Sequence, residues 1–239
     1  MEHSPRLRLA PSAALKEKRL AALMAGRAPG QPLLAAALRE AQLIGSLELA
    51  GQPATLEEVR AAVRGDEVAP AAVRGLARAH GAVAPDSPLS VRTLVKWNAA
   101  LTLGEGALRS SDRERPDGPP PSPPEFIGSR LAILEHWMEV ESSRELRPAQ
   151  QGALVMARLV EILPFEAGNG RVARLAASHL MVRAGSRPPI LYGADAPRLS
   201  QALSAAFRLE TEPLSALLDE AAERALDLAL QTLEAQPPP

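Results

Sequence analysis

The sequence predicts an all-α protein, and three observations support this expectation. Apolar residues make up 46% of the 239 positions but aromatic residues only 3%, so alanine and leucine must fill most of the core, and both favour helices. Apolar side chains recur at helical spacing, for example at Ala153, Met156 and Val160. No stretch shows a convincing strand-like alternation, and no internal repeat of useful period is present.

Five helices are expected in the first 104 residues, because capping and stop signals delimit each of them. Thr55 is placed as an N-cap with Glu58 as its capping-box partner. Ser90 is expected to cap the fifth helix and Gly104 to end it. The expected ranges are 12–25, 32–50, 56–64, 70–80 and 91–103.

Residues 105–125 are rich in proline, glycine and charge, so they cannot be a helix interior or a central strand. They are either a linker between two helical halves or an exposed extended segment or short hairpin beside a site. Further helices are expected after them, at 125–141, 148–162, 170–184 and, split near Pro213, over 196–235. The chain thus divides into an N-terminal helical region (1–104), the segment 105–125 and a helical core (126–235).

Composition and charge exclude several classes of protein. The formal net charge is −1, so no overall field draws the chain to nucleic acid or acidic lipid. There is no cysteine, which excludes disulfides, thiol catalysis and cysteine-based zinc sites. No apolar run is long enough to span a bilayer, and the N-terminus lacks the apolar centre of a secretory signal. We therefore expect a cytoplasmic protein.

The stretch "ILPFEAGNGRVARLAASHL" is the strongest candidate for a functional site. A helix should end there and a new one begin, with its first amides and its dipole directed at the turn. Gly168 and Gly170 allow close backbone approach and positive φ, and Asn169 tolerates a left-handed conformation. Arg171 and Arg174 share one face of the first turn. This turn could hold an anion, or it could simply join two helices.

The letters "LPFEAGNGRVAR" resemble the signature of the Fic (Fido) family, H-P-F-x-[D/E]-G-N-G-R-x-x-R. The matching residues are Pro164, Phe165, Gly168, Asn169, Gly170, Arg171 and Arg174. Residues 41–51 resemble the family's inhibitory helix, [S/T]-x-x-x-E-[G/N], with Ser46 and Gly51 in place, and 105–125 resembles its flap. The resemblance covers roughly residues 31–230. It implies the Fic/Fido helical fold with an N-terminal helical extension and a short extended or β-hairpin flap.

The resemblance also implies an activity. Such proteins mostly move AMP from ATP to a hydroxyl of a target protein, with a divalent metal, while the flap docks the target by strand-like pairing. The motif histidine is the general base and the acidic residue binds the metal. Phe165 and Gly168 belong to the anion-binding motif, Asn169 to Arg171 would surround the α- and β-phosphates, and Arg174 would lie near the γ-phosphate.

Three positions depart from the family pattern. Leu163 stands at the base position and cannot accept a proton, although base assistance is worth about 10²–10⁴-fold in rate. Ala167 stands at the metal-ligand position without an oxygen for Mg²⁺. Ala50 stands where the inhibitory glutamate would pair with the second motif arginine, so Arg174 should have no carboxylate partner there.

No neighbouring residue is an obvious replacement. Glu166 lies one position before the expected acid and is only a weak candidate for a metal ligand. His179 lies about 13 Å along the helix from Gly170 and is expected to be a core or helix-face residue. Glu48 should face a different side of its helix from Ala50, so it is not expected to replace the inhibitory carboxylate.

The sequence therefore predicts an inactive or very weak AMP-transferase that can still bind a nucleotide or a phosphate anion. ATP is a candidate ligand, whereas Ala167 argues against Mg²⁺ as a cofactor. Two alternatives stay open: an active transferase with a rearranged site, and a purely structural protein-interaction module. The target or partner protein is not identified, and a homodimer is compatible with the sequence.

Overall fold

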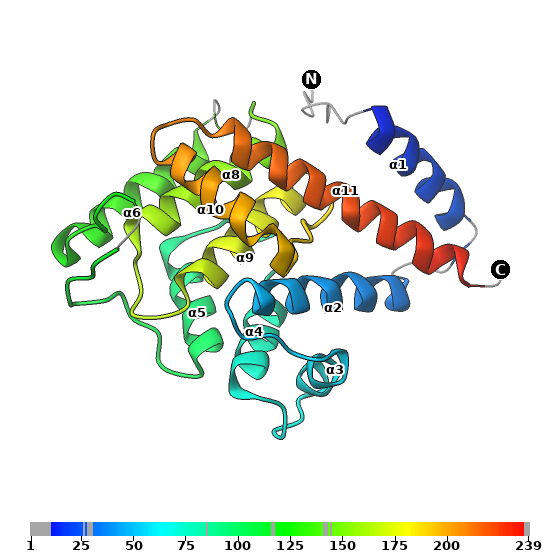
Figure 1. Ribbon diagram of the computed structural model, residues 1–239, viewed down its shortest axis with the longest axis horizontal. Coiled ribbons are helices and arrows are strands. Elements are labelled where there is room, and N and C mark those ends of the chain that lie inside the picture. Colours follow the sequence, from blue (N-terminus) through cyan, green and yellow to red (C-terminus); the bar gives the residue numbers. More distant parts are fainter. Residues whose placement is uncertain are drawn as a thin grey trace.

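The computed structural model describes residues 11–25, 27, 31–84, 86–115, 118–140, 143 and 145–236 (Figure 1). The first ten residues of the expected N-terminal region, residues 116–117 of the segment 105–125 and three residues near 142 lie outside this description. The regular structure of the described residues is entirely helical, which confirms the predicted fold class. None of the helices described has both the length and the apolarity that a bilayer span requires.

The described helices follow the expected order. They are α1 (Pro11–Met24), α2 (Pro32–Glu48), α3 (Leu56–Arg64), α4 (Ala71–Gly81), α5 (Val91–Thr102), α6 (Pro124–Glu139), α8 (Pro148–Ile162), α9 (Asn169–Arg183), α10 (Ala196–Ala206) and α11 (Glu212–Glu234), with a short 3-10 helix at Gly193–Asp195.

The helices α8 and α9 lie side by side at the centre of the molecule, and α11 packs against α8 (Figure 1). One hydrophobic cluster joins them to α2 through α5, with Leu47, Trp97, Met156 and Met181 among its fully buried members. A smaller cluster packs α1 against α11 and the start of α2. The helix that carries Ser46 is thereby held in the same core as the helix that carries the motif arginines.

Most helix ends follow the predicted signals, with one difference. Thr55 forms the predicted capping box with Glu58, and Ser90 caps α5 through the backbone N–H of Thr93. The left-handed residue that ends α5 is Leu103, with φ 55°, and not Gly104. A six-to-one bond from Gly104 N–H to the carbonyl of Ala99 closes this end at 3.0 Å, so the glycine lies one position beyond the left-handed residue.

The capping box of α3 gives a first prediction. Thr55→Ala removes the bond to the N–H of Glu58 and the return bond from the Thr55 hydroxyl, so the free energy of unfolding should fall by about 1 kcal/mol. Urea denaturation measures the loss. Thr55→Ser keeps the hydroxyl and should lose no more than a few tenths of a kcal/mol. An equal loss in both variants would contradict a capping role.

The segment 105–123 runs past the C-terminal end of α8 and contains neither helix nor strand in its described residues (Figure 1). Its backbone pairs with the motif loop at one point, where Arg109 N–H donates to the carbonyl of Pro164 at 2.9 Å. Of the two interpretations of this segment, its contacts support the one that places it beside the candidate site. We call residues 105–123 the flap segment.

Candidate functional site

The loop between α8 and α9 takes its shape from two left-handed residues. Leu163 ends α8 with φ 53° and ψ 61°, and Pro164 follows it. Gly168 precedes α9 with φ 81°, and a Cβ added there would lie 2.6 Å from Cδ2 of Leu101. Glycine is therefore needed at 168 for both conformation and space. Gly170 is helical, so only one of the two motif glycines uses its freedom to adopt positive φ.

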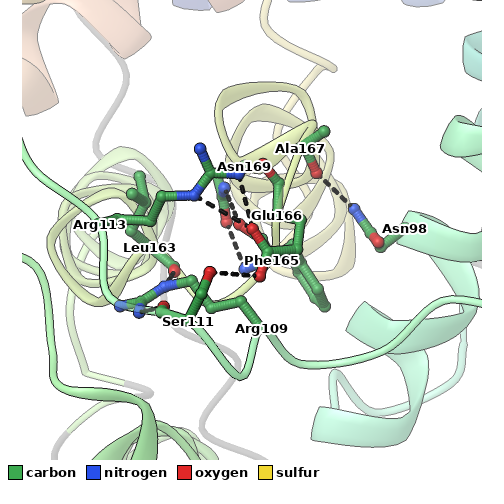
Figure 2. A network of polar contacts seen from close by, with 9 residues as sticks. All are labelled: Asn98, Arg109, Ser111, Arg113, Leu163, Phe165, Glu166, Ala167 and Asn169. Atoms are coloured by element: carbon green, nitrogen blue, oxygen red, sulfur yellow. Dashed lines mark hydrogen bonds and ion pairs between the residues drawn. The ribbon is translucent and has the colours of Figure 1, made fainter.

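The side chain of Asn169 closes this loop on itself. Its Oδ1 accepts from the N–H of Phe165 at 2.9 Å, and its Nδ2 donates to the carbonyl of Phe165 at 2.7 Å (Figure 2). From α5, the buried Asn98 donates to the carbonyl of Ala167 at 2.8 Å. The Asn169 side chain thus has one N–H left for any ligand. Phe165 is 1% exposed and packs in the core, so its role in the motif is to anchor the loop.

The N-terminus of α9 presents unpaired donors. Within the described residues, the N–H groups of Asn169, Gly170 and Arg171 have no hydrogen-bond partner. The guanidinium of Arg171 is half-buried and has neither a hydrogen bond nor an ion pair there. Free amides, the positive end of the helix dipole and an unpaired cation coincide at this point, which is the arrangement that binds anions.

Arg174 lies one turn further along α9 and is held by α2. Its Nε donates to Oγ of Ser46 at 3.0 Å and its Nη2 to the Ser46 carbonyl at 2.8 Å. Burial, and after it the positive charge of Arg171, lower the pKa of Arg174 to about 10. Ala50 lies in the turn after α2, and Glu48 instead accepts from the N–H of Gly193 at 2.8 Å. Among the described residues, Arg174 is therefore held by the neutral Ser46 and by no carboxylate.

Two residues of the flap segment bind the carboxylate of Glu166. Oε1 of Glu166 accepts from the hydroxyl of Ser111 at 2.9 Å, and Oε2 accepts from Nε and Nη2 of Arg113 at 3.1 and 2.6 Å (Figure 2). Arg113 also donates to the Glu166 carbonyl at 2.8 Å. The hydrogen bonds from Ser111 and then from Arg113 lower the pKa of Glu166. Both oxygens of the weak metal-ligand candidate are thus already engaged.

Two arginines of the flap segment hold the C-terminal end of α8, and sequence reasoning missed both. Arg109 is 3% exposed and donates to four backbone carbonyls, those of Leu163, Ser111, Ser122 and Ile162. Arg115 donates to the carbonyls of Val160 and Glu161. The last carbonyls of a helix lack internal partners and carry the negative end of its dipole, so these cations satisfy both needs. In the sequence they are not distinguishable from surface charges.

The contact between Glu166 and the flap segment gives a second prediction. The contact lowers the pKa of Glu166 in the folded state, so it stabilises the folded protein at pH values above the unfolded pKa of about 4.3. This stabilisation is lost as the pH falls through the lower folded-state pKa. The Arg113 side-chain N–H resonance should follow this titration in NMR spectra. Glu166→Gln should move that resonance at neutral pH, whereas Glu161→Gln should leave it in place. A resonance unmoved by Glu166→Gln would exclude the ion pair.

Comparison with known proteins shows that this site resembles that of one family. Residues 88–181 match the model of the Fic/DOC family. A protein adenylyltransferase Fic of Drosophila mojavensis is 36% identical over 104 residues, which cover 42% of this chain and 21% of the relative. The fic-1 adenylyltransferase of Caenorhabditis briggsae is 38% identical over 71 residues, covering 30% of this chain and 14% of the relative. The matches thus span about a fifth or less of these curated relatives.

Solved structures share the fold over most of the chain. Fic-1 from C. elegans aligns with a TM-score of 0.74 and 19% identity over 92% of this chain and 71% of its own. A Fic domain-containing signaling protein from Bacteroides thetaiotaomicron aligns with a TM-score of 0.74 and 18% identity over 95% and 99% of the two chains. IbpAFic2, in a structure covalently tethered to Cdc42, aligns with a TM-score of 0.53 and 17% identity over 92% and 73%. The motif, the sequence relatives and the fold all resemble the Fic/DOC family, whose model matches residues 88–181.

Proposed function

We propose that this protein binds a nucleotide or another phosphate-bearing anion at the N-terminus of α9, and that it transfers AMP very weakly or not at all. The observation that carries the proposal is a separation of roles within one motif. The donors that would hold phosphates are free at Gly170 and Arg171, whereas Leu163 and Ala167 carry no group that can move a proton or bind a metal.

The holding part of the site has the donors that phosphates need. An anion at the first turn of α9 would meet backbone N–H groups, the dipole and the half-buried Arg171 together. Arg174, one turn further along α9 than Arg171, adds a second positive charge. It is buried, so solvent and salt screen its charge less. A purely structural turn gives no reason to leave an unpaired, half-buried guanidinium beside another one, so this feature favours ligand binding over a structural interaction module.

The part of the site that would carry out the transfer has neither a general base nor a metal ligand. Without a base at 163, a target hydroxyl keeps its proton during attack, which costs about 10²–10⁴-fold in rate. The residues present do not fit a magnesium site, because Ala167 offers no oxygen and the Glu166 carboxylate is bound by the flap segment. The described residues also contain no cluster of three or more potential metal-ligating side chains. Positioning and electrostatics alone would sustain at most slow transfer.

An active transferase would need a rearranged site. Glu166 would have to leave both Ser111 and Arg113 and turn toward the phosphates, which costs the contacts that now hold the flap segment.

A protein partner is also part of the proposal, since the related IbpAFic2 has been captured with Cdc42. The many prolines of the flap segment leave few N–H groups for strand-like pairing, so side chains must supply most of its contacts to a partner.

Ligand-induced thermal stabilisation tests the binding site. ATP, ADP, AMP and inorganic phosphate should each be compared, and ligand at about 100 times Kd adds about 2.7 kcal/mol to stability. We expect at least one nucleotide to raise Tm without a requirement for Mg²⁺. Arg171→Ala should abolish the shift, and Arg208→Ala, an exposed arginine on another helix end, should preserve it. No shift with any of the four ligands would favour the structural interaction module.

A further inference from the structure

The loop between α8 and α9 contains a single ionisable residue, Glu166, whose charge opposes the binding of an anion. The loop from Leu163 to Gly168 reads LPFEAG, so no other side chain within it can offset this charge. The side chain is half exposed, and hydrogen bonds from Ser111 and then from Arg113 lower its pKa, so it is ionised at neutral pH. A ligand at the start of α9 therefore has a fixed carboxylate in the adjoining loop.

The carboxylate belongs to the same closed loop as the free amides of α9. The Asn169 side chain bonds both the N–H and the carbonyl of Phe165, the residue before Glu166. Three residues span at most about 11 Å between Cα atoms even when extended, and the closed loop shortens this distance. The Debye length at physiological ionic strength is about 8 Å, so salt screens the charge of Glu166 only partly at the start of the helix.

Arg113 of the flap segment supplies a compensating charge. Its Nε and Nη2 donate to Oε2 of Glu166 at 3.1 and 2.6 Å, and Nη2 also donates to the Glu166 carbonyl at 2.8 Å (Figure 2). The carboxylates that flank it in the chain, Asp112 and Glu114, make no ion pair with it among the described residues. Three hydrogen bonds thus fix the guanidinium on one residue of the motif loop, and the pair has no net charge.

Attachment of the flap segment does not depend on this pair. The buried Arg109 and the half-buried Arg115 already bond the last carbonyls of α8, and Arg109 N–H bonds the carbonyl of Pro164. An exposed ion pair adds little to stability. Its charge has a larger effect on a phosphate-bearing ligand, because such a ligand carries several negative charges close to Glu166.

We propose that Arg113 is a positioning residue of the anion site, which acts through Glu166: by cancelling the negative charge of the motif loop, it sets the affinity of the site for phosphate-bearing ligands. This inference rests on the anion binding proposed above and adds a role for the flap segment in it. With Arg113 in place, a ligand meets a neutral loop and the cations of α9. When the flap segment leaves the loop, the uncovered carboxylate repels the ligand.

Isothermal titration calorimetry with AMP and ATP, without Mg²⁺, tests this role. Arg113→Gln should raise Kd about threefold for AMP and about tenfold for ATP, because ATP brings more negative charge. Adding Glu166→Gln to Arg113→Gln should return both Kd values to within about twofold of those of the natural protein. The effect of Arg113→Gln should shrink in 0.5 M NaCl, which a purely structural loss would not do.

Arg158→Gln is the matched control. Arg158 also pairs with a glutamate, and its side chain is 46% exposed against 44% for Arg113, but its partner is Glu161 on α8. Its Kd values should equal those of the natural protein.

The outcomes separate this inference from the proposed function. If the natural protein binds neither nucleotide, both fail. If it binds them and folded Arg113→Gln binds them equally well, only the role of Arg113 is overturned. A loss that Glu166→Gln does not rescue, or that is the same for AMP and ATP, would also overturn it, because Arg113 would then act by direct contact or by shaping the loop.

Discussion

The double substitution Leu163→His and Ala167→Asp is expected to produce AMP transfer where the natural chain gives little or none. Histidine at 163 restores a proton acceptor, worth about 10²–10⁴-fold in rate, and aspartate at 167 restores an oxygen ligand for Mg²⁺. The backbone favours the first change, because Leu163 has φ 53°, a region that histidine adopts more readily than leucine. Since Ala50 supplies no inhibitory carboxylate, the restored site should be unrestrained.

Intact mass spectrometry after incubation with ATP and Mg²⁺ measures this transfer as added AMP on the protein itself or on proteins of a cell extract. Each single variant should label far less than the double variant, because base and metal act on the same step. Adding Arg171→Ala to the double variant should remove the label again. A folded double variant that binds ATP but never labels would show that the losses extend beyond positions 163 and 167.

The substitution Arg109→Met is expected to lower the free energy of unfolding by about 3–5 kcal/mol, because it leaves several buried carbonyls without a donor, and each costs about 1–3 kcal/mol. That is a large share of the 5–15 kcal/mol typical of a folded domain. Methionine keeps much of the apolar stem of arginine, so the loss reports chiefly on the hydrogen bonds. The free energy of unfolding of Arg109→Lys should lie between those of the natural chain and Arg109→Met, because an ammonium cannot reproduce the guanidinium fork.

Urea denaturation of three arginine variants separates this role from general charge effects. Arg115→Met should cost less than Arg109→Met, since Arg115 is less buried and bonds fewer carbonyls. Arg158→Met, which removes only an exposed ion pair with Glu161, should stay within about 0.5 kcal/mol of the natural chain. If Arg109→Met and Arg158→Met cost the same, the flap segment is not anchored by Arg109.

The helical elements could be predicted because their determinants are local. Thr55, Ser90 and Pro148 act within one turn of the residues they cap or start, and each is found in the predicted role. The end of α5 could not be placed to the residue, because the choice between Leu103 and Gly104 as the left-handed position depends on the bonds that close the turn. The irregular form of the flap segment followed from its prolines, but its attachment to α8 did not.

The positions of the site residues could be predicted from the sequence motif, but their hydrogen-bond partners could not. The motif register located the loop, the free N–H groups at the start of α9 and the pair of arginines on that helix. The partners of those residues lie far away in sequence: Ser46 for Arg174, Arg113 for Glu166 and Asn98 for the carbonyl of Ala167. Such pairs follow from packing, which no local spacing reports. The same is true of Asn169, whose side chain closes its own loop and so offers phosphates less than the motif implies.

One measurement tests most directly whether the site holds an anion without transferring AMP. The natural protein is incubated with ATP labelled on the α-phosphate, Mg²⁺ and cell extract, and bound and covalently attached label are counted from the same sample. We expect label that binds reversibly and depends on Arg171, with little or none attached covalently to protein. Robust covalent labelling that Arg171→Ala abolishes would contradict it.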